Sequence, residues 1–265
     1  MSFADQITAI IVTSPIWCNP STAIIDETYY QLRYHLGTDV RILILMDGTH
    51  PEETYLYDRY NGFMKTLEAR DWDNVECVRF SQWRHQSGML RQVLIEQELV
   101  TTPLVFWTEH DIPLCDKRID WNGLVASLVD GEYGGIRFEL NGDGNDSQSR
   151  GEHINDHGVP IRRTFQFLGW PHLFRTVALK RFIETYGNAK TYLETGDFEG
   201  FWSRNYEEFP YGVYNPPEDA IRCYHTNGRE RNIPGQKKTL KPYVEIDGHH
   251  RYPSNGKPYI RIPEL

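Results

Sequence analysis

An acidic element in the middle of the chain is the first candidate for chemistry. Thr108-Glu109-His110-Asp111 follows directly on the apolar run Leu104 to Trp107. Carboxylates in an open position suit hard divalent cations, which take oxygen ligands and share them with substrate phosphates. Acidic triplets are also common as solvated loop acids or helix caps, and that interpretation stays open. The element is thus a candidate site for a cation with its phosphate partner.

A late histidine is the second candidate. His225 stands in Cys223-Tyr224-His225-Thr226-Asn227-Gly228-Arg229, and imidazole is a better ligand for Mn-like metals than for Mg. Basic residues that match phosphate oxygens surround it in the sequence, namely Arg222, Arg229, Arg231, Lys237 and Lys238. The alternatives are a structural, hydrogen-bonded histidine and a solvated basic tail.

Two acids in the second half of the chain could move a proton. Thr195-Gly196-Asp197-Phe198-Glu199 places both carboxylates at the start of an expected helix. A transfer to a hydroxyl group needs a general base that accepts its proton, and either acid could serve. Asp197 is also a good helix N-cap, with Glu199 in the first turn. We therefore prefer Glu199 as the candidate base.

A basic segment follows the third apolar run of the chain. Arg84-His85-Gln86-Ser87-Gly88 opens an expected helix, and Arg91 comes about one turn later. A helix N-terminus with Gly and Arg nearby favours an anion. The alternative is a capped helix that carries surface arginines.

The elements that position these residues alternate in the first half of the chain. The expected strands are 7–12, 40–46, 75–80 and 103–107, with helices starting at Asn19-Pro20, at Pro51 and at His85, the first ending at Gly37. This alternation predicts a parallel sheet with helices on both faces. Ligands bind at the carboxyl ends of such strands, where we expect Ser14, Asp47 and the Glu109 to Asp111 triplet at one edge.

The second half of the chain is less regular. Tyr133 to Leu140 reads as a strand, and Asn141 to Gly158 as a long loop. Helices are expected at 175–186, closed by Gly187, and at 197–206, with a last strand at 220–225. No internal repeat and no strong linker divides the chain into independent domains.

Composition limits the class of protein. A net charge of −9 argues against an overall electrostatic grip on nucleic acid or on an anionic membrane. The four cysteines are scattered without CxxC spacing, which favours free thiols in a reducing compartment. The sequence shows no leader pattern and no apolar run of membrane-spanning length. We expect a soluble, cytoplasmic protein with no membrane span.

Taken together, these pieces resemble the GT-A glycosyltransferases, particularly their family-2-like branch. The resemblance covers roughly residues 7–230 and rests on four features: the runs 10–15, 43–48 and 105–111, and the late His225. It implies an α/β fold with a mostly parallel central sheet flanked by helices. It also implies one catalytic domain over 1–230, with a nucleotide-sugar half (1–115) and an acceptor half (116–230), followed by a basic Pro/Gly-rich extension (231–265).

The resemblance also implies roles for individual residues. The base and ribose of the nucleotide would lie against Thr13, Ser14, Pro15 and Asp47. The family's D-x-D metal element reads Glu109-His110-Asp111 here, with Glu in place of the first Asp, so metal ligation passes to Asp111, with His225 completing the shell. Arg84 and Arg91 would face the base or phosphate, Arg229 belongs to the phosphate clamp, and the inverting base would be Glu199. Phe167 to His172 would lie on the acceptor side.

The implied function is sugar transfer that depends on Mn²⁺ or Mg²⁺. The donor would be a UDP-, GDP- or dTDP-sugar, and the acceptor hydroxyl could belong to a glycan, a small glycoside or a modified nucleic-acid base. A nucleotidyltransferase is the nearest alternative, although Thr13 to Asn19 lacks the Gly, Lys and Arg of its usual phosphate loop. A non-catalytic nucleotide- or carbohydrate-binding module on the same fold is another.

Overall fold

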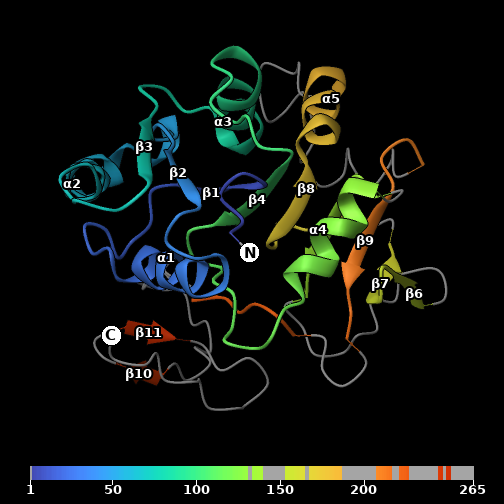
Figure 1. Cartoon of the computed structure of the whole chain (residues 1–265). Helices are drawn as coiled ribbons and strands as arrows, with labels where there is room; N and C mark the ends of the chain where they lie inside the picture. The colour runs from blue at the N-terminus through green and yellow to red at the C-terminus, as the bar shows by residue number, and fades with distance from the viewer. Residues whose placement is uncertain are drawn as a thin grey trace.

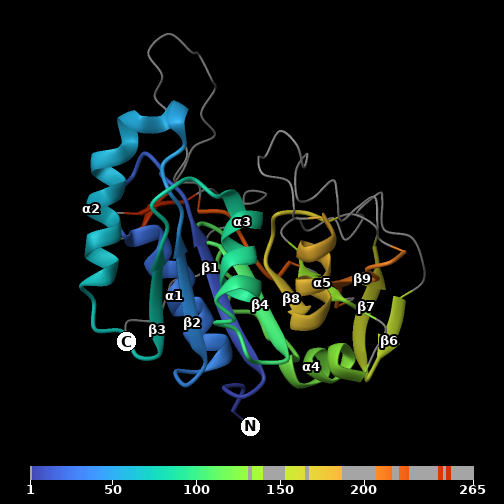
Figure 2. The same ribbon diagram turned by 90° about the horizontal axis from the view of Figure 1, so that it is seen from above.

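The computed structural model describes residues 2–130, 133–139, 153–164, 167–186, 207–216, 221–226, 244–246 and 249–251. A nine-stranded sheet runs through the molecule in the order β3-β2-β1-β4-β8-β5-β9-β7-β6 (Figures 1 and 2). Its strands are β1 (Ile7–Thr13), β2 (Arg41–Met46), β3 (Val75–Arg79), β4 (Leu104–Glu109), β5 (Gly135–Phe138), β6 (His153–Asp156), β7 (Val159–Arg163), β8 (His172–Arg175) and β9 (Tyr211–Tyr214).

Helices cover both faces of this sheet. They are α1 (Ala23–Leu36), α2 (Tyr57–Glu68), α3 (His85–Arg91), α4 (Trp121–Asp130) and α5 (Thr176–Tyr186), with a 3-10 helix η1 (Pro51–Leu56) and a π-helix η2 (Gln92–Glu96). The apolar sides of α1, α2 and α4 share one buried cluster with one face of the sheet. Those of α3 and α5 share a second cluster with the opposite face (Figure 1). The layers are therefore helix, sheet, helix, as the alternation of elements predicts.

The first four strands form the parallel part of the sheet. All seven residues of β1 are buried, which is why its sequence is a continuous apolar run rather than an alternating one. β1 pairs in parallel with both β2 and β4, and β2 pairs in parallel with β3. The register sets Thr13 opposite Met46 and Val12 opposite Glu109. The carboxyl ends of β1, β2 and β4 therefore meet at one edge, as expected.

The remaining strands make the sheet mixed. β8 lies between β4 and β5 and is antiparallel to both, while β5 and β9 are parallel. β7 is antiparallel to β9 and to β6. The described strands of this sheet thus form four parallel and four antiparallel pairs, so the expectation of a mostly parallel sheet holds only as far as β4. The late strand β8 enters beside β4 from the opposite direction, which ends the parallel series.

Several expected boundaries are corrected. The first helix begins at Ala23 and not at Asn19, because the Asn19 side chain accepts a hydrogen bond from the Ile16 backbone N–H at 2.8 Å and closes a loop instead. The expected loop 141–158 contains β6, and the expected strand 220–225 makes only isolated bridges, such as Leu114 with Cys223. The helix α4 and the strands β8 and β9 were not predicted.

The other expectations for the chain's second half stand as follows. The helix at 175–186 is confirmed as α5. Gly187 and the helix expected at 197–206 lie outside the described residues. A two-stranded antiparallel sheet pairs β10 (Val244–Ile246) with β11 (His249–Arg251). Across the described part of the chain, no helix combines the length and the apolar character needed to cross a bilayer.

Candidate functional site

A pocket of about 600 Å³ opens at the carboxyl edge of β1, β2 and β4. Part of its lining comes from residues that the sequence analysis selected: Thr13, Ser14, Pro15, Asp47, Glu109 and His110. They come from three different strand ends, which the parallel register brings together. The placement agrees with the general position of ligand sites in open α/β sheets.

Sequence reasoning missed most of a second wall of the pocket, since it had singled out the segment that holds His85 and Gln86 but not the rest. η1 and the turn before it contribute His50, Glu52, Glu53, Tyr55 and Leu56, the loop after β1 contributes Ile16 and Trp17, and the start of α3 with the residues before it contributes Trp83, His85, Gln86 and Met89. The rings of Trp17 and Tyr55 lie 5.5 Å apart. The signal available in the sequence was the density of aromatic and histidine side chains beside the expected strand ends.

The charge of the pocket is negative. Its described lining holds four carboxylates, those of Asp47, Glu52, Glu53 and Glu109, and neither lysine nor arginine. A diphosphate placed here would meet acids on several sides. Electrostatics therefore require a bound cation, or a basic group from outside the described lining, for such a ligand to be held.

Asp47 braces the wall that contains the start of α3. Its carboxylate accepts backbone N–H groups from Gly48 at 2.8 Å, from Arg84 at 2.7 Å and from His85 at 2.9 Å. Burial raises the pKa of Asp47 to about 6, and these three hydrogen bonds oppose that rise. Gly48 supports the same contact, since a Cβ there would lie 2.1 Å from the backbone carbon of Gln82. Asp47 therefore holds the start of α3 in place through backbone hydrogen bonds, whether or not a ligand is bound.

Glu109 is oriented by a neighbour from α3. Gln86 Nε2 donates to Glu109 Oε1 at 2.7 Å. The next residue, His110, is 1% exposed, and its Nδ1 lies 3.3 Å from the carbonyl oxygen of Val12. Thr28 of α1 donates its hydroxyl to the His110 carbonyl at 2.7 Å. The residues that end β4 are thus fixed from β1, α1 and α3 at once.

Asp111 and His225 lie side by side although 113 residues separate them in the chain. His225 Nε2 is 3.5 Å from Asp111 Oδ2; the Asp111 side chain is fully buried and the His225 side chain is 34% exposed. Backbone hydrogen bonds explain the contact, because the N–H of Thr226 donates to the Asp111 carbonyl at 2.8 Å and that of Tyr224 to the Pro113 carbonyl at 3.1 Å. The closing segment, residues 221–226, therefore runs antiparallel to the loop after β4.

The chemistry of this pair fits a divalent cation. A carboxylate oxygen and an imidazole nitrogen are ligands that Mn²⁺ accepts. No cluster of three or more Asp, Glu, His or Cys side chains suited to metal binding is found among the described residues. A cation held by two protein ligands would complete its shell with water and with oxygens of a phosphate ligand, as Mg²⁺ usually does.

The two arginines expected to face the ligand do not line the pocket. Arg84 contributes its backbone N–H to Asp47, and Arg91 pairs with Glu96 on the surface at 3.3 Å. His85 and Gln86 lie in the wall instead, because the backbone of His85 adopts a left-handed conformation with φ of 58° at the start of α3. Asp197, Glu199 and Arg229 lie outside the described residues, so their expected roles stay predictions.

Comparison with known proteins finds similarity only in three dimensions. No protein-family model and no curated protein sequence matches this chain. Among solved structures, GalNAc-T7 with UDP, GalNAc and Mn²⁺ superposes with a TM-score of 0.51 at 11% identity, covering 83% of this chain and 43% of the other. S. aureus TarS 1–349 in complex with UDP-GlcNAc superposes with a TM-score of 0.51 at 11% identity, covering 85% of this chain and 59% of the other.

A third match is the mannosyltransferase PcManGT from Pyrobaculum calidifontis in complex with GDP-Man and Mn²⁺, with a TM-score of 0.48 at 14% identity, covering 83% and 56%. This chain thus spans about half the length of the solved proteins it resembles. The mixed sheet, its flanking helices and the superpositions at 0.51 agree with one another. The chain has the GT-A fold of glycosyltransferases.

Proposed function

We propose that this protein is a metal-dependent glycosyltransferase that moves a sugar from a nucleoside diphosphate sugar to an acceptor hydroxyl. The observation that carries the proposal is the contact of Asp111 with His225 just after β4, where the preceding residue, His110, lines a pocket of about 600 Å³. Structures with the same fold hold UDP with Mn²⁺, or UDP-GlcNAc. A UDP-, GDP- or dTDP-sugar is the ligand class that we assign to this pocket.

The acidic lining supports the metal dependence. With carboxylates and no lysine or arginine in the described lining, a free diphosphate would be repelled. Asp111 and His225 would hold Mn²⁺ or Mg²⁺ beside the pocket, and the cation would neutralise charge on the departing nucleoside diphosphate. The donor would bind as its metal complex.

The remaining pocket residues hold and orient the donor. Thr13, Ser14 and Pro15 would contact the base and ribose, while Asp47 fixes the wall that carries His85. Gln86 keeps the Glu109 carboxylate turned toward itself, which prevents that carboxylate from rotating freely next to the phosphates. This division separates residues that touch the donor from residues that position them.

The stereochemical course is proposed from the sequence. Glu199 would accept the proton of the acceptor hydroxyl, which then attacks the anomeric carbon with inversion. Glu199→Gln should lower kcat more than it changes donor affinity. A rise in the donor's KM with kcat untouched would assign Glu199 to binding, and retention of configuration in the product would remove its role as base.

A ligand screen tests the assignment of function. Thermal unfolding would be followed with UDP, GDP, dTDP and ADP, each with Mn²⁺ and with EDTA. A ligand at 100 times its Kd stabilises the fold by roughly 2.7 kcal/mol, which a thermal shift detects. Because the cation would bridge protein and diphosphate, the nucleotide of the donor should raise the unfolding temperature only when Mn²⁺ is present. Equal shifts in EDTA would contradict the metal bridge. Slow hydrolysis of the matching nucleotide sugar would then distinguish an enzyme from a binding module.

A further inference from the structure

One buried hydrogen bond joins helix α1 to the closing segment, residues 221–226. The Tyr224 hydroxyl donates to the Glu27 carboxylate across 197 residues of sequence. Tyr224 is 9% exposed and Glu27 is 3% exposed. A buried carboxylate is costly unless it is hydrogen-bonded, and Glu27 is buried on α1, one turn after the buried apolar residue Ile24. Helix and sheet packing alone do not require an acid at this position.

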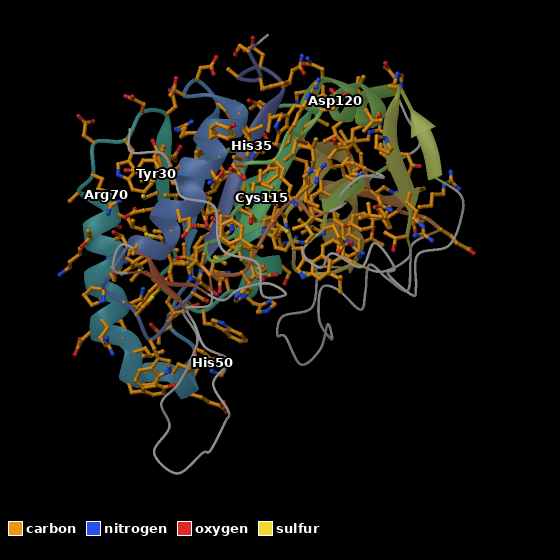
Figure 3. All side chains as sticks on the ribbon, turned by 90° about the horizontal axis from the view of Figure 1, so that it is seen from below. Tyr30, His35, His50, Arg70, Cys115 and Asp120 are labelled. Atoms are coloured by element: carbon orange, nitrogen blue, oxygen red, sulfur yellow. The ribbon has the colours of Figure 1, made fainter. Side chains whose placement is uncertain are left out.

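Two other side chains of α1, those of Thr28 and His35, contact the loop after β4. Thr28 donates to the His110 carbonyl at 2.7 Å, and His35 Nε2 lies 2.7 Å from the Cys115 carbonyl oxygen (Figure 3). These two contacts fix the first part of the loop after β4, from His110 to Cys115. Glu27 lies one residue before Thr28 and reaches past that loop to the closing segment, so α1 holds both strands of the antiparallel contact that brings Asp111 to His225.

Tyr224 and His225 are adjacent in the closing segment, so fixing the Tyr224 side chain restricts where the His225 side chain can lie. Backbone hydrogen bonds link this segment to the loop after β4 in both directions. The Cys115 N–H donates to the Arg222 carbonyl, and the Tyr224 N–H donates to the Pro113 carbonyl, as between antiparallel chains. Side chains of adjacent residues in an extended chain point to opposite sides. With the Tyr224 side chain fixed toward Glu27, the adjacent His225 is constrained as well, and its Nε2 lies 3.5 Å from Asp111 Oδ2.

We propose that Glu27 and Tyr224 are positioning residues that hold His225 against Asp111, so that the pair is preorganised for a divalent cation. The inference rests on the proposed function, because it assigns these residues to the same metal site. Residues that orient metal ligands typically change metal affinity ten- to a hundredfold when altered. A bond that served only the core would change the unfolding temperature and leave metal affinity as it was.

The test measures binding of Mn²⁺ alone, without nucleotide, by electron paramagnetic resonance. Tyr224→Phe keeps the ring and removes the donor, and Glu27→Met removes the acceptor at similar length. Each should weaken Mn²⁺ binding by about ten- to a hundredfold. The double variant should be no weaker than the worse single variant, since both lose one shared bond. Glu27→Gln retains an acceptor oxygen and should restore affinity to within about threefold of wild type.

A matched control removes a buried hydroxyl elsewhere. Thr176 is 6% exposed and donates to the Thr102 carbonyl at 2.7 Å, at the opposite end of β4 from Asp111. Thr176→Val should lower the unfolding temperature and leave Mn²⁺ affinity unchanged. The modulation of the Mn²⁺ echo by an imidazole nitrogen should be present in wild type, be lost in His225→Ala and weaken in Tyr224→Phe.

Two results would overturn the inference, and they differ. Mn²⁺ affinities of Tyr224→Phe and Glu27→Met within twofold of wild type, with unfolding temperatures lowered as in Thr176→Val, would make the bond purely structural and leave the proposed function standing. Absence of Mn²⁺ binding by the wild-type protein would refute the metal site and this inference together. Should Tyr224→Phe fail to fold, the Glu27→Met and Glu27→Gln pair gives the same decision.

Discussion

The half of the chain through β4 and the half that follows it are built in different ways. In the first half the strands pair in parallel with one another, and β1 is buried along its whole length. In the second half the described strands of the large sheet are four or five residues long, and apart from the β6–β7 pair they pair out of chain order. The first half thus forms a regular edge on its own, while the second depends on contacts between distant segments.

This difference locates the candidate site on the boundary between the halves. Asp111 ends the regular half, and His225 comes from the irregular one. The pocket itself is lined by residues of the first half. Nucleotide binding should therefore follow the integrity of the first half, and metal binding should require both.

The largest expected effect is at the residue where the halves meet. Asp111→Asn keeps the shape of a fully buried side chain and removes the charge that a cation needs. We expect turnover to fall on the order of a thousandfold, with thermal unfolding close to wild type. Assays at saturating Mn²⁺ measure this directly. Full activity there would mean that the pair of Asp111 and His225 is a structural contact.

A glycine tests whether the first half alone builds the pocket wall. In Gly48→Ala the new Cβ would lie 2.1 Å from the Gln82 backbone carbon, so the segment leading into α3 must move. We expect a loss of about 3 kcal/mol in the free energy of unfolding and weaker nucleotide binding. Gly62→Ala is the matched control, because its nearest neighbour lies at 3.4 Å and a helical glycine costs stability. It should be slightly stabilising, with unchanged affinity.

The sequence predicted the regular half far better than the irregular one. Continuous apolar runs, as in β1, specify buried parallel strands, and parallel strands place Ser14, Asp47 and Glu109 at one edge by geometry alone. The antiparallel insertion of β8 depends on pairing between segments that no local pattern records. Local patterns also gave the wrong helix start at Asn19, where a side chain to backbone bond closes a loop.

The candidate site also combines features that could be predicted from the sequence with features that could not. The position of Asp47 was predictable, but two of its three backbone N–H partners, Arg84 and His85, were not, because they lie 37 and 38 residues further along the chain. The contact of His225 with Asp111 was expected from the family resemblance, and the structure brings them to 3.5 Å. The wall made by η1 was missed, since nothing local to Tyr55 indicates that it lies near Trp17.

Titration of Asp47 measures how strongly burial at the carboxyl edge of β1, β2 and β4 disfavours a charged side chain. Its pKa is raised from an ordinary 3.8 to about 6, so between these values the folded protein keeps a proton that the unfolded chain has released. Its ionisation therefore works against folding. The advantage in unfolding free energy of wild type over Asp47→Asn should shrink by roughly 2 kcal/mol as pH rises from 4 to 6. Denaturant unfolding across that range gives the slope, and a flat difference would show that the three N–H bonds cancel the effect of burial.

The smallest expected effect concerns an arginine that sequence reasoning placed at the ligand. Arg91 pairs with Glu96 at 3.3 Å and does not line the pocket, so Arg91→Gln should change nucleotide affinity by less than about twofold and stability by no more than about 0.5 kcal/mol. Gln86→Leu is the comparison variant in the same helix. It removes the 2.7 Å bond that orients the Glu109 carboxylate in the pocket wall, which should weaken nucleotide binding several-fold. Calorimetric titration with UDP and Mn²⁺ measures the affinity of each variant. A larger loss of UDP affinity in Arg91→Gln than in Gln86→Leu would mean that Arg91 contacts the ligand, as the sequence predicted.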